Sequence, residues 1–211
     1  MASDGHSHRP PPDLAPDQLL AAYRMGIFPM AVPEYGNAIF WFAPDPRGIL
    51  PLDGFHVSKS LRRTVRQQRF EVRFDADFEA VVRACAAPRD GHGESWISEA
   101  IVRAYCRLHQ LGHAPSVACY REGALAGGLY GVAFGAAFCG ESMFHHARDA
   151  SKVALVHLVR TLRRWGFQLL DTQYTTPHLE RFGAQAIPRH EYEARLADAV
   201  TVADRWGGSE G

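Results

Sequence analysis

The chain has 211 residues, of which 46% are hydrophobic and 22% are charged, as in ordinary soluble globular proteins. Its 23 basic and 23 acidic side chains cancel, so net charge gives no argument for a nucleic-acid partner, and such a surface would have to be local. No apolar run approaches the roughly 20 residues of a membrane span, and the length is sufficient to bury a sizeable core.

The first half of the chain mixes short helices and strands. Residues 1–12 are rich in proline and are expected to form a disordered leader and not a secretory signal. The pattern that follows predicts these elements: a helix over 13–25 that Asp13 caps and Gly26 ends, two short apolar runs over 37–52 around a Pro-Asp-Pro turn, a basic helix over 56–68, a strand over 70–75 and a helix over 78–87.

The second half begins with a longer helix and continues as a sheet. The expected elements are a helix over 96–112, strands over 115–144 with a hairpin turn at 121–124, a helix over 151–166, a strand over 167–173 and two small helical pieces within 178–196. A meander, a helix and a returning strand follow one another in the core of acyl-CoA N-acyltransferase folds. We therefore expect an α+β (mixed α/β) protein, with a small N-terminal α/β domain over 13–90 and an acyl-CoA N-acyltransferase-like domain over 91–211.

Two carboxylates lie at or just after apolar strands. Glu141 follows "FCG" and Asp171 follows "FQLL", and Gln173 would share the strand face of Asp171 if the strand continues. Either acid could cap a loop or pair with Arg148 or Arg121. The functional alternative is that both acids converge on one cleft, where burial and neighbouring charges adjust their protonation.

The basic helix and several aromatic residues are candidates for nucleic-acid contact. Spacings of three and four align most of its cations on one face, which is either a solvated surface or a track for phosphates. Aromatic side chains near loops or glycines could stack on bases, although ordinary core packing is the preferred explanation for any single one. The cations are Lys59, Arg62, Arg63, Arg66 and Arg69, and the aromatics are Trp41, Trp96, Tyr105 and Tyr130.

Other chemistries find little support. The four cysteines form no C-x-x-C pair and suit a reduced, cytosolic setting. Cys106, His109 and His113 share a helix but lack a fourth ligand at suitable spacing, so we expect no metal. No G-x-S-x-G elbow, P-loop or dinucleotide fingerprint is present, and the phosphate-binding signature of coenzyme A users is missing, so we expect no cofactor.

Eight segments in order resemble the leucyl/phenylalanyl-tRNA–protein transferases. They are "YRMGIFPM", "WFAPDPRGILPL", "FHVSKSLRR", "SWIS", "GGLYGVAFGAAFCGESMF", "ASKVAL", "LLDTQ" and "FGAQAIPR", and they cover residues 20–195. The resemblance implies transfer of leucine or phenylalanine, and less often methionine, from aminoacyl-tRNA to the α-amino group of proteins that begin with Arg or Lys. The product would be marked for N-degron degradation. The resemblance also implies a cytoplasmic monomer without metal or coenzyme.

The resemblance assigns roles by motif. Asp171 and Gln173 of "LLDTQ" fall on the proposed catalytic pair, and Glu141 falls on a cleft carboxylate. Trp41, Trp96 and Tyr105 fall on positions near the tRNA 3′ end. The positions of the apolar amino-acid pocket are Leu129, Phe138, Leu155, Leu158 and Leu170. The cations expected to bind acceptor-stem phosphates are Lys59, Arg62, Arg63 and Arg66. Met30 stands where tryptophan is usual and Ser95 where threonine is common, which leaves the exact pocket shape open.

Two alternatives remain at this point. A coenzyme A–dependent N-acetyltransferase would share the fold, but the absent phosphate-binding signature counts against it. A catalytically inert RNA-binding module would use the basic helix and the aromatics, and it would leave Asp171, Gln173 and the apolar pocket without a purpose. Thermal stabilisation by acetyl-CoA, as against aminoacyl-tRNA or puromycin, tests the first alternative. Mixing the protein with Phe-tRNA and an Arg-initiated peptide tests the second, because an inert module would yield no product.

Overall fold

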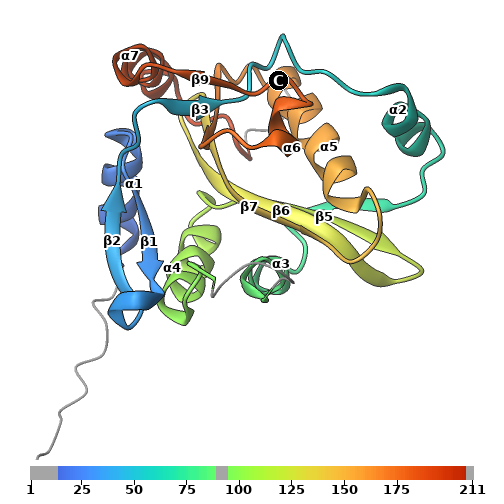
Figure 1. Cartoon of the computed structure of the whole chain (residues 1–211), viewed down its shortest axis with the longest axis horizontal. Coiled ribbons are helices and arrows are strands. Elements are labelled where there is room, and N and C mark those ends of the chain that lie inside the picture. The colour runs from blue at the N-terminus through green and yellow to red at the C-terminus, as the bar shows by residue number, and fades with distance from the viewer. Residues whose placement is uncertain (1–13, 89–94, 208–211) are drawn as a thin grey trace, which may run out of the picture.

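The structure is a computed structural model that describes residues 14–88 and 95–207, so the expected leader and the Asp13 cap lie outside it. Figure 1 shows a central sheet with helices on both faces. The helices are α1 (Pro16–Arg24), η1 (Pro33–Tyr35), α2 (Lys59–Arg66), α3 (Phe78–Ala86), α4 (Glu99–Gln110), α5 (Ala150–Arg164), α6 (Pro177–Glu180) and α7 (Arg189–Val200). The strands are β1 (Phe28–Val32), β2 (Ala38–Phe42), β3 (Arg47–Ile49), β4 (Glu71–Phe74), β5 (Ser116–Arg121), β6 (Ala124–Phe134), β7 (Ala137–His145), β8 (Leu169–Gln173) and β9 (Gln185–Ile187).

In the described part of the chain, seven strands form the central sheet in the order β4-β5-β6-β7-β8-β3-β9. Among these described strands only β7 and β8 pair in parallel, and α5 connects them. The mixed α+β class is confirmed, as is the expected order of meander, helix and returning strand. β3 and β4 precede residue 90 but hydrogen-bond into this same sheet, so the sheet takes strands from both sides of the expected domain boundary.

Apolar side chains fill both faces of the sheet. One cluster packs α1, α3 and α4 beneath it, and a second packs α5 and α2 above it. On α5, Leu155, Leu158 and Leu162 recur at helical spacing and are all buried, because that stripe faces the sheet. Burying a leucine side chain contributes about 1.5–3 kcal/mol, so α5 is held firmly against the sheet, chiefly over β5 and β6.

Two short strands depart from the expected pattern. β1 was not expected; it pairs with β2 in a separate two-stranded sheet, in register from Phe28↔Phe42 to Val32↔Ala38. β9 occupies the break between the two expected helical pieces and pairs with β3. A strand of three residues shows too few alternations to be read from a sequence, and its existence here depends on its partner strand. Within residues 14–88 and 95–207, no helix is both long and apolar enough to cross a membrane.

Candidate active site

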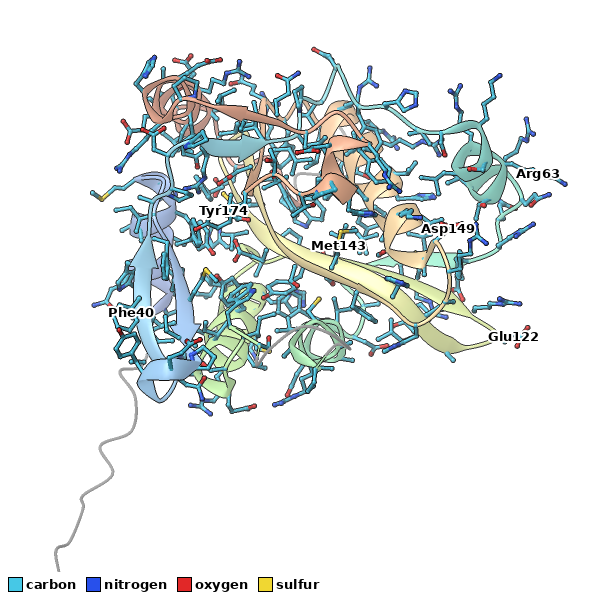
Figure 2. The ribbon with its side chains drawn as sticks, in the orientation of Figure 1. Phe40, Arg63, Glu122, Met143, Asp149 and Tyr174 are labelled. Carbon is cyan, nitrogen blue, oxygen red and sulfur yellow. The ribbon has the colours of Figure 1, made fainter. Side chains whose placement is uncertain are left out.

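A cavity opens where β7 and β8 separate. The two strands pair from Ala137↔Leu169 to Cys139↔Asp171, and beyond that register both strands continue unpaired with each other. The cavity has a volume of about 250 Å³. Its lining comprises Phe28, Met30, Trp96, Leu129, Tyr130, Gly140, Glu141, Ser142, Met143, Leu155, Leu158, Leu170, Thr172, Gln173, Tyr174, Thr176 and Leu179. In Figure 2, Met143 and Tyr174 mark its two sides.

Glu141 lies in the middle of β7 and not at a strand end. β6 pairs through Tyr130↔Ser142 and Gly131↔Gly140, so Glu141 is the extra residue of a β-bulge between them. A bulge re-aims the side chain of the extra residue and is common beside active sites. The bulge therefore brings a carboxylate into a cavity that apolar side chains otherwise dominate.

Protein donors hold both carboxylate oxygens of Glu141. The Tyr105 hydroxyl donates to Oε2 at 3.1 Å, and Gln173 Nε2 donates to Oε1 at 3.3 Å. Tyr23 in turn shares a hydrogen bond with Tyr105, so two buried phenols stand behind the carboxylate. The pKa of Glu141 is raised to about 7, chiefly by burial and also by the charge of Asp171, while the hydrogen bonds from Tyr23 and Tyr105 lower it. Glu141 can therefore change its protonation state near neutral pH.

Asp171 is buried and does not line the cavity. Arg47 grips its carboxylate through Nε at 2.9 Å and Nη2 at 2.6 Å, and the Tyr192 hydroxyl donates to it at 2.9 Å. Asp171 Oδ1 also accepts the backbone N–H of Gln173 at 2.8 Å. The remaining Arg47 nitrogen, Nη1, donates to the Gly26 carbonyl at 2.8 Å. The fully paired ion pair thus fixes the backbone from which Gln173 projects.

Gln173 has a left-handed backbone with φ of 58°. Residues with a Cβ adopt this conformation at a cost of about 1 kcal/mol, and such residues concentrate at functional sites. The turn breaks the alternation of β8, so Gln173 lines the cavity although Asp171 does not. β3 presses close at this point, since a Cβ on Gly48 would lie 2.5 Å from the carbonyl carbon of Tyr174.

Four of the five expected pocket leucines and phenylalanines line the cavity, namely Leu129, Leu155, Leu158 and Leu170. Phe138 does not. It is fully buried in the core, with its ring centroid 5.7 Å from that of Trp206. Phe138 precedes the bulge on β7 and packs in the same apolar cluster as the pocket leucines, but it contributes no surface to the cavity.

The expected aromatics separate into three environments. Trp96 lines the cavity. Tyr105 is buried and reaches the site only through its bond to Glu141. Trp41 is 44% exposed, and it pairs with Pro29 on the face of the β1–β2 hairpin opposite to Phe28 and Met30. Tyr130, the fourth expected aromatic, also lines the cavity, and Met30 was noted only as a departure from the family. The lining residues to which the sequence assigned no role are Phe28, Gly140, Ser142, Met143, Thr172, Tyr174, Thr176 and Leu179.

The basic helix α2 presents its cations to solvent. Lys59, Arg62, Arg63 and Arg66 are all exposed, whereas Leu61 and Val65 pack inward. Figure 2 shows Arg63 pointing away from the body of the molecule. Arg62 donates from Nε to the Val57 carbonyl at 3.1 Å, which holds the start of α2 against the preceding loop.

His109 of α4 has structural partners. His109 Nδ1 lies 2.8 Å from the Ala114 carbonyl oxygen, and its ring stacks on Phe78 at a centroid distance of 4.2 Å. In the part of the chain that the structure describes, no group of three or more His, Cys, Asp or Glu side chains is arranged to hold a metal ion.

Distant likenesses to solved structures exist. The structure of L-PGS from Bacillus licheniformis matches with a TM-score of 0.41 and 12% identity over 74% of this chain and 49% of that one. The C-terminal domain of a putative lysylphosphatidylglycerol synthetase from Agrobacterium fabrum matches with a TM-score of 0.40 and 13% identity, over 86% and 62%. Similarity at this level carries no argument about function.

Sequence comparison is far more specific. Residues 49–197 match the family described as leucyl/phenylalanyl-tRNA protein transferase, and residues 12–45 match the N-terminal domain of the same family. The leucyl/phenylalanyl-tRNA–protein transferase of Paramagnetospirillum magneticum is 56% identical over 89% of this chain and 90% of its own length, and that of Maricaulis maris is 55% identical over 87% and 85%. The chain therefore belongs to the leucyl/phenylalanyl-tRNA–protein transferase family and is a tRNA-dependent aminoacyltransferase.

Proposed function

We propose that the protein transfers leucine or phenylalanine, and less readily methionine, from aminoacyl-tRNA to the α-amino group of proteins that begin with Arg or Lys. The product would enter N-degron degradation, and the enzyme would act as a cytoplasmic monomer without metal or coenzyme. The observation that carries the proposal is an apolar cavity whose polar end holds one carboxylate and one amide, Glu141 and Gln173, joined by a hydrogen bond.

The apolar end of the cavity suits the donor side chain. Leu129, Leu155, Leu158 and Leu170 form a slot that an unbranched Cβ can enter, whereas the second Cγ of Val or Ile would meet its walls. A single methylene in such a pocket discriminates by about 1–3 kcal/mol. We therefore expect selection among donors to be graded, with Leu and Phe favoured over Val and Ile.

The polar end of the cavity suits the two amines of the reaction. When the donor side chain fills the slot, the donor's α-amino group, which is bonded to the Cα that carries this side chain, would lie near Glu141. The ionised carboxylate of Glu141 would hold the amine there. Gln173 donates its amide N–H to Glu141, so its carbonyl oxygen remains available to accept a hydrogen bond from the attacking amine. Holding that amine against the ester carbonyl supplies rate acceleration by orientation.

No strong base is required for the attack. An α-amino group has a pKa of about 7.7–8.0, so a useful fraction is neutral at cellular pH. Aminolysis forms the new C–N bond, breaks the ester C–O bond and returns the proton to the released ribose hydroxyl. A neutral amide cannot take that proton, so Gln173 orients and stabilises the amine as positive charge develops on it.

Asp171 would not contact the reacting groups and would act through Gln173. It binds the backbone N–H of Gln173 and is itself locked by Arg47, so we assign it as a positioning residue. The exposed cations of α2 would hold acceptor-stem phosphates without reading bases.

The test is transfer of Phe from Phe-tRNA to a peptide with N-terminal Arg. The same peptide with an acetylated N-terminus is the control, because it keeps the side chain and lacks the nucleophile. Transfer to the first peptide only is expected, and Gln173→Ala should lower kcat with little change in the Kd for Phe-tRNA. Absence of transfer by the wild-type protein would overturn the proposed function. An equal loss of binding and rate in the variant would make Gln173 structural.

A further inference from the structure

A second groove continues from the active-site cavity. It has a volume of about 850 Å³ and shares Ser142, Met143, Thr176 and Leu179 with the cavity. Its remaining lining comes from the end of β7, the loop that follows, the first turn of α5 and the start of α6, and comprises His145, His146, Arg148, Asp149, Ser151, Lys152 and His178. The cavity and the groove are therefore adjacent, and an extended ligand can occupy both.

The groove is cationic. Asp149 is the one acid among its described lining residues, and it is already paired with Lys152 at 2.7 Å and with Arg148 at 3.9 Å. Arg148 is 95% exposed, so most of its guanidinium surface is free for a ligand. The imidazoles of His145, His146 and His178 add N–H donors and flat rings on which bases can stack.

The charge and the place of the groove indicate its occupant. An acceptor that begins with Arg or Lys carries two positive charges at its end and would be repelled. A nucleic acid strand carries one negatively charged phosphate per nucleotide. When the aminoacyl ester lies beside Glu141, the tRNA strand attached to it must extend out of the cavity. The groove is the exit that matches its charge.

Beyond this groove the cationic surface continues along α5. Eight residues separate Lys152 from Arg160, a rise of about 12 Å along the helix. His157 and Arg160 line another groove, whose opposite wall carries Arg62, Arg66 and Arg69 from α2 and the turn after it. In Figure 2, Met143, Asp149 and Arg63 follow one another from the cavity toward α2. A strand on this course ends at the surface proposed for the acceptor stem.

We propose that the groove formed by residues 145–152 and His178 binds the phosphates of the donor tRNA's 3′ single strand, with Arg148 and Lys152 as the main contacts. The inference rests on the proposed function, because it needs an aminoacyl ester in the cavity. It adds a second RNA-binding segment to the cations of α2.

The test compares two donors, Phe-tRNA and phenylalanyl-adenosine, which carries the same ester but no phosphate. Arg148→Ala and Lys152→Ala should each raise KM for Phe-tRNA several-fold. Each should also lower the slope of log KM against log salt by about 0.7, the value for one single-strand phosphate contact. Neither should alter transfer from phenylalanyl-adenosine. Arg103→Ala is the matched control, since Arg103 is an exposed arginine with a 3.9 Å ion pair on α4, on the opposite side of the sheet.

The outcomes separate the hypotheses. If neither variant changes KM for Phe-tRNA while the wild type is active, the groove does not bind the donor. If both variants raise KM for the acceptor peptide with either donor, the groove binds the acceptor protein instead. If the wild type transfers from neither donor, the proposed function itself fails. Circular dichroism verifies folding, and Arg148→Ala alone suffices should Lys152→Ala not fold, because the Arg148 side chain is almost fully exposed.

Discussion

Replacing Glu141 by glutamine should change how stability depends on pH. The folded-state pKa of Glu141 is about 7, raised from 4.5 chiefly by burial. Below pH 4.5 the side chain is protonated in both the folded and the unfolded states. As the pH rises toward 7, the unfolded chain loses this proton first, so the folded state loses stability and continues to do so until its own carboxyl ionises.

The size of this effect follows from the shift in pKa. A difference of about 2.5 units at about 1.4 kcal/mol per unit makes the ionised carboxylate cost the folded state about 3 kcal/mol at pH 8. Glutamine cannot ionise, and its carbonyl oxygen can still accept the hydrogen bond from Tyr105. Glu141→Gln should therefore match the wild type near pH 4.5 and exceed its free energy of unfolding by about 3 kcal/mol at pH 8.

Urea denaturation of both proteins at pH 5, 6, 7 and 8 measures the difference directly. The two proteins share every other titratable group, so the difference isolates residue 141. A difference that stays constant across this range would refute the reasoning, because it would mean that the folded protein ionises Glu141 as readily as the unfolded chain does. The same variant should transfer more slowly at pH 8 despite its greater stability. A carboxylate with a purely structural role would not show that combination.

Three further predictions concern the buried ion pair of Asp171, the backbone of Gln173 and the basic helix α2. Asp171→Asn leaves Arg47 buried without its charge partner and should lower the free energy of unfolding by about 3–5 kcal/mol. The control Asp198→Asn, at an exposed position of α7, should change it little. Equal effects in urea denaturation would contradict the role of the ion pair. Gln173→Gly should be about 1 kcal/mol more stable than Gln173→Ala, because glycine adopts a positive φ without strain. Both variants should lose transfer activity equally. If the alanine variant is the more stable in urea denaturation, the backbone of Gln173 is not strained. The double variant Arg63→Glu and Arg66→Glu should weaken Phe-tRNA binding and flatten its salt dependence in filter binding, with Arg103→Glu as the control. An unchanged slope of the log binding constant against log salt would exclude α2 from the interface.

The sequence predicted regular elements better than irregular ones. α5 carries Leu155 and Leu158 at helical spacing, and a helix of that length depends on one amphipathic face, so both its existence and its inward stripe follow from the pattern. The strand assigned to Asp171 was also correct, since the apolar residues Phe167, Leu169 and Leu170 precede it and α5 delivers the segment to the sheet. These two elements place three pocket leucines, Leu155, Leu158 and Leu170, and the polar Gln173 around one cavity.

Three features of the site lie beyond such patterns. The β-bulge at Glu141 cannot be recognised from the sequence of β7, because it adds one residue to the strand without changing its composition. The assumption that Asp171 and Gln173 share a face requires regular alternation, which the positive φ of Gln173 breaks. The partner of Asp171 is Arg47, 124 residues earlier in the chain, and only the pairing of β3 with β8 brings them together.

These irregularities have a common cause. Two parallel strands that stayed paired to their ends would close the cavity, so β7 and β8 must part after Cys139 and Asp171. Each strand then needs a local distortion to turn one polar side chain into the gap, and the bulge and the left-handed residue supply it. Both distortions cost stability, and β3 offsets part of that cost through the ion pair of Arg47 and the close contact of Gly48. The residues that shape the active site are therefore partly those that never touch the substrate, and a change at Arg47 should impair transfer as surely as one at Gln173.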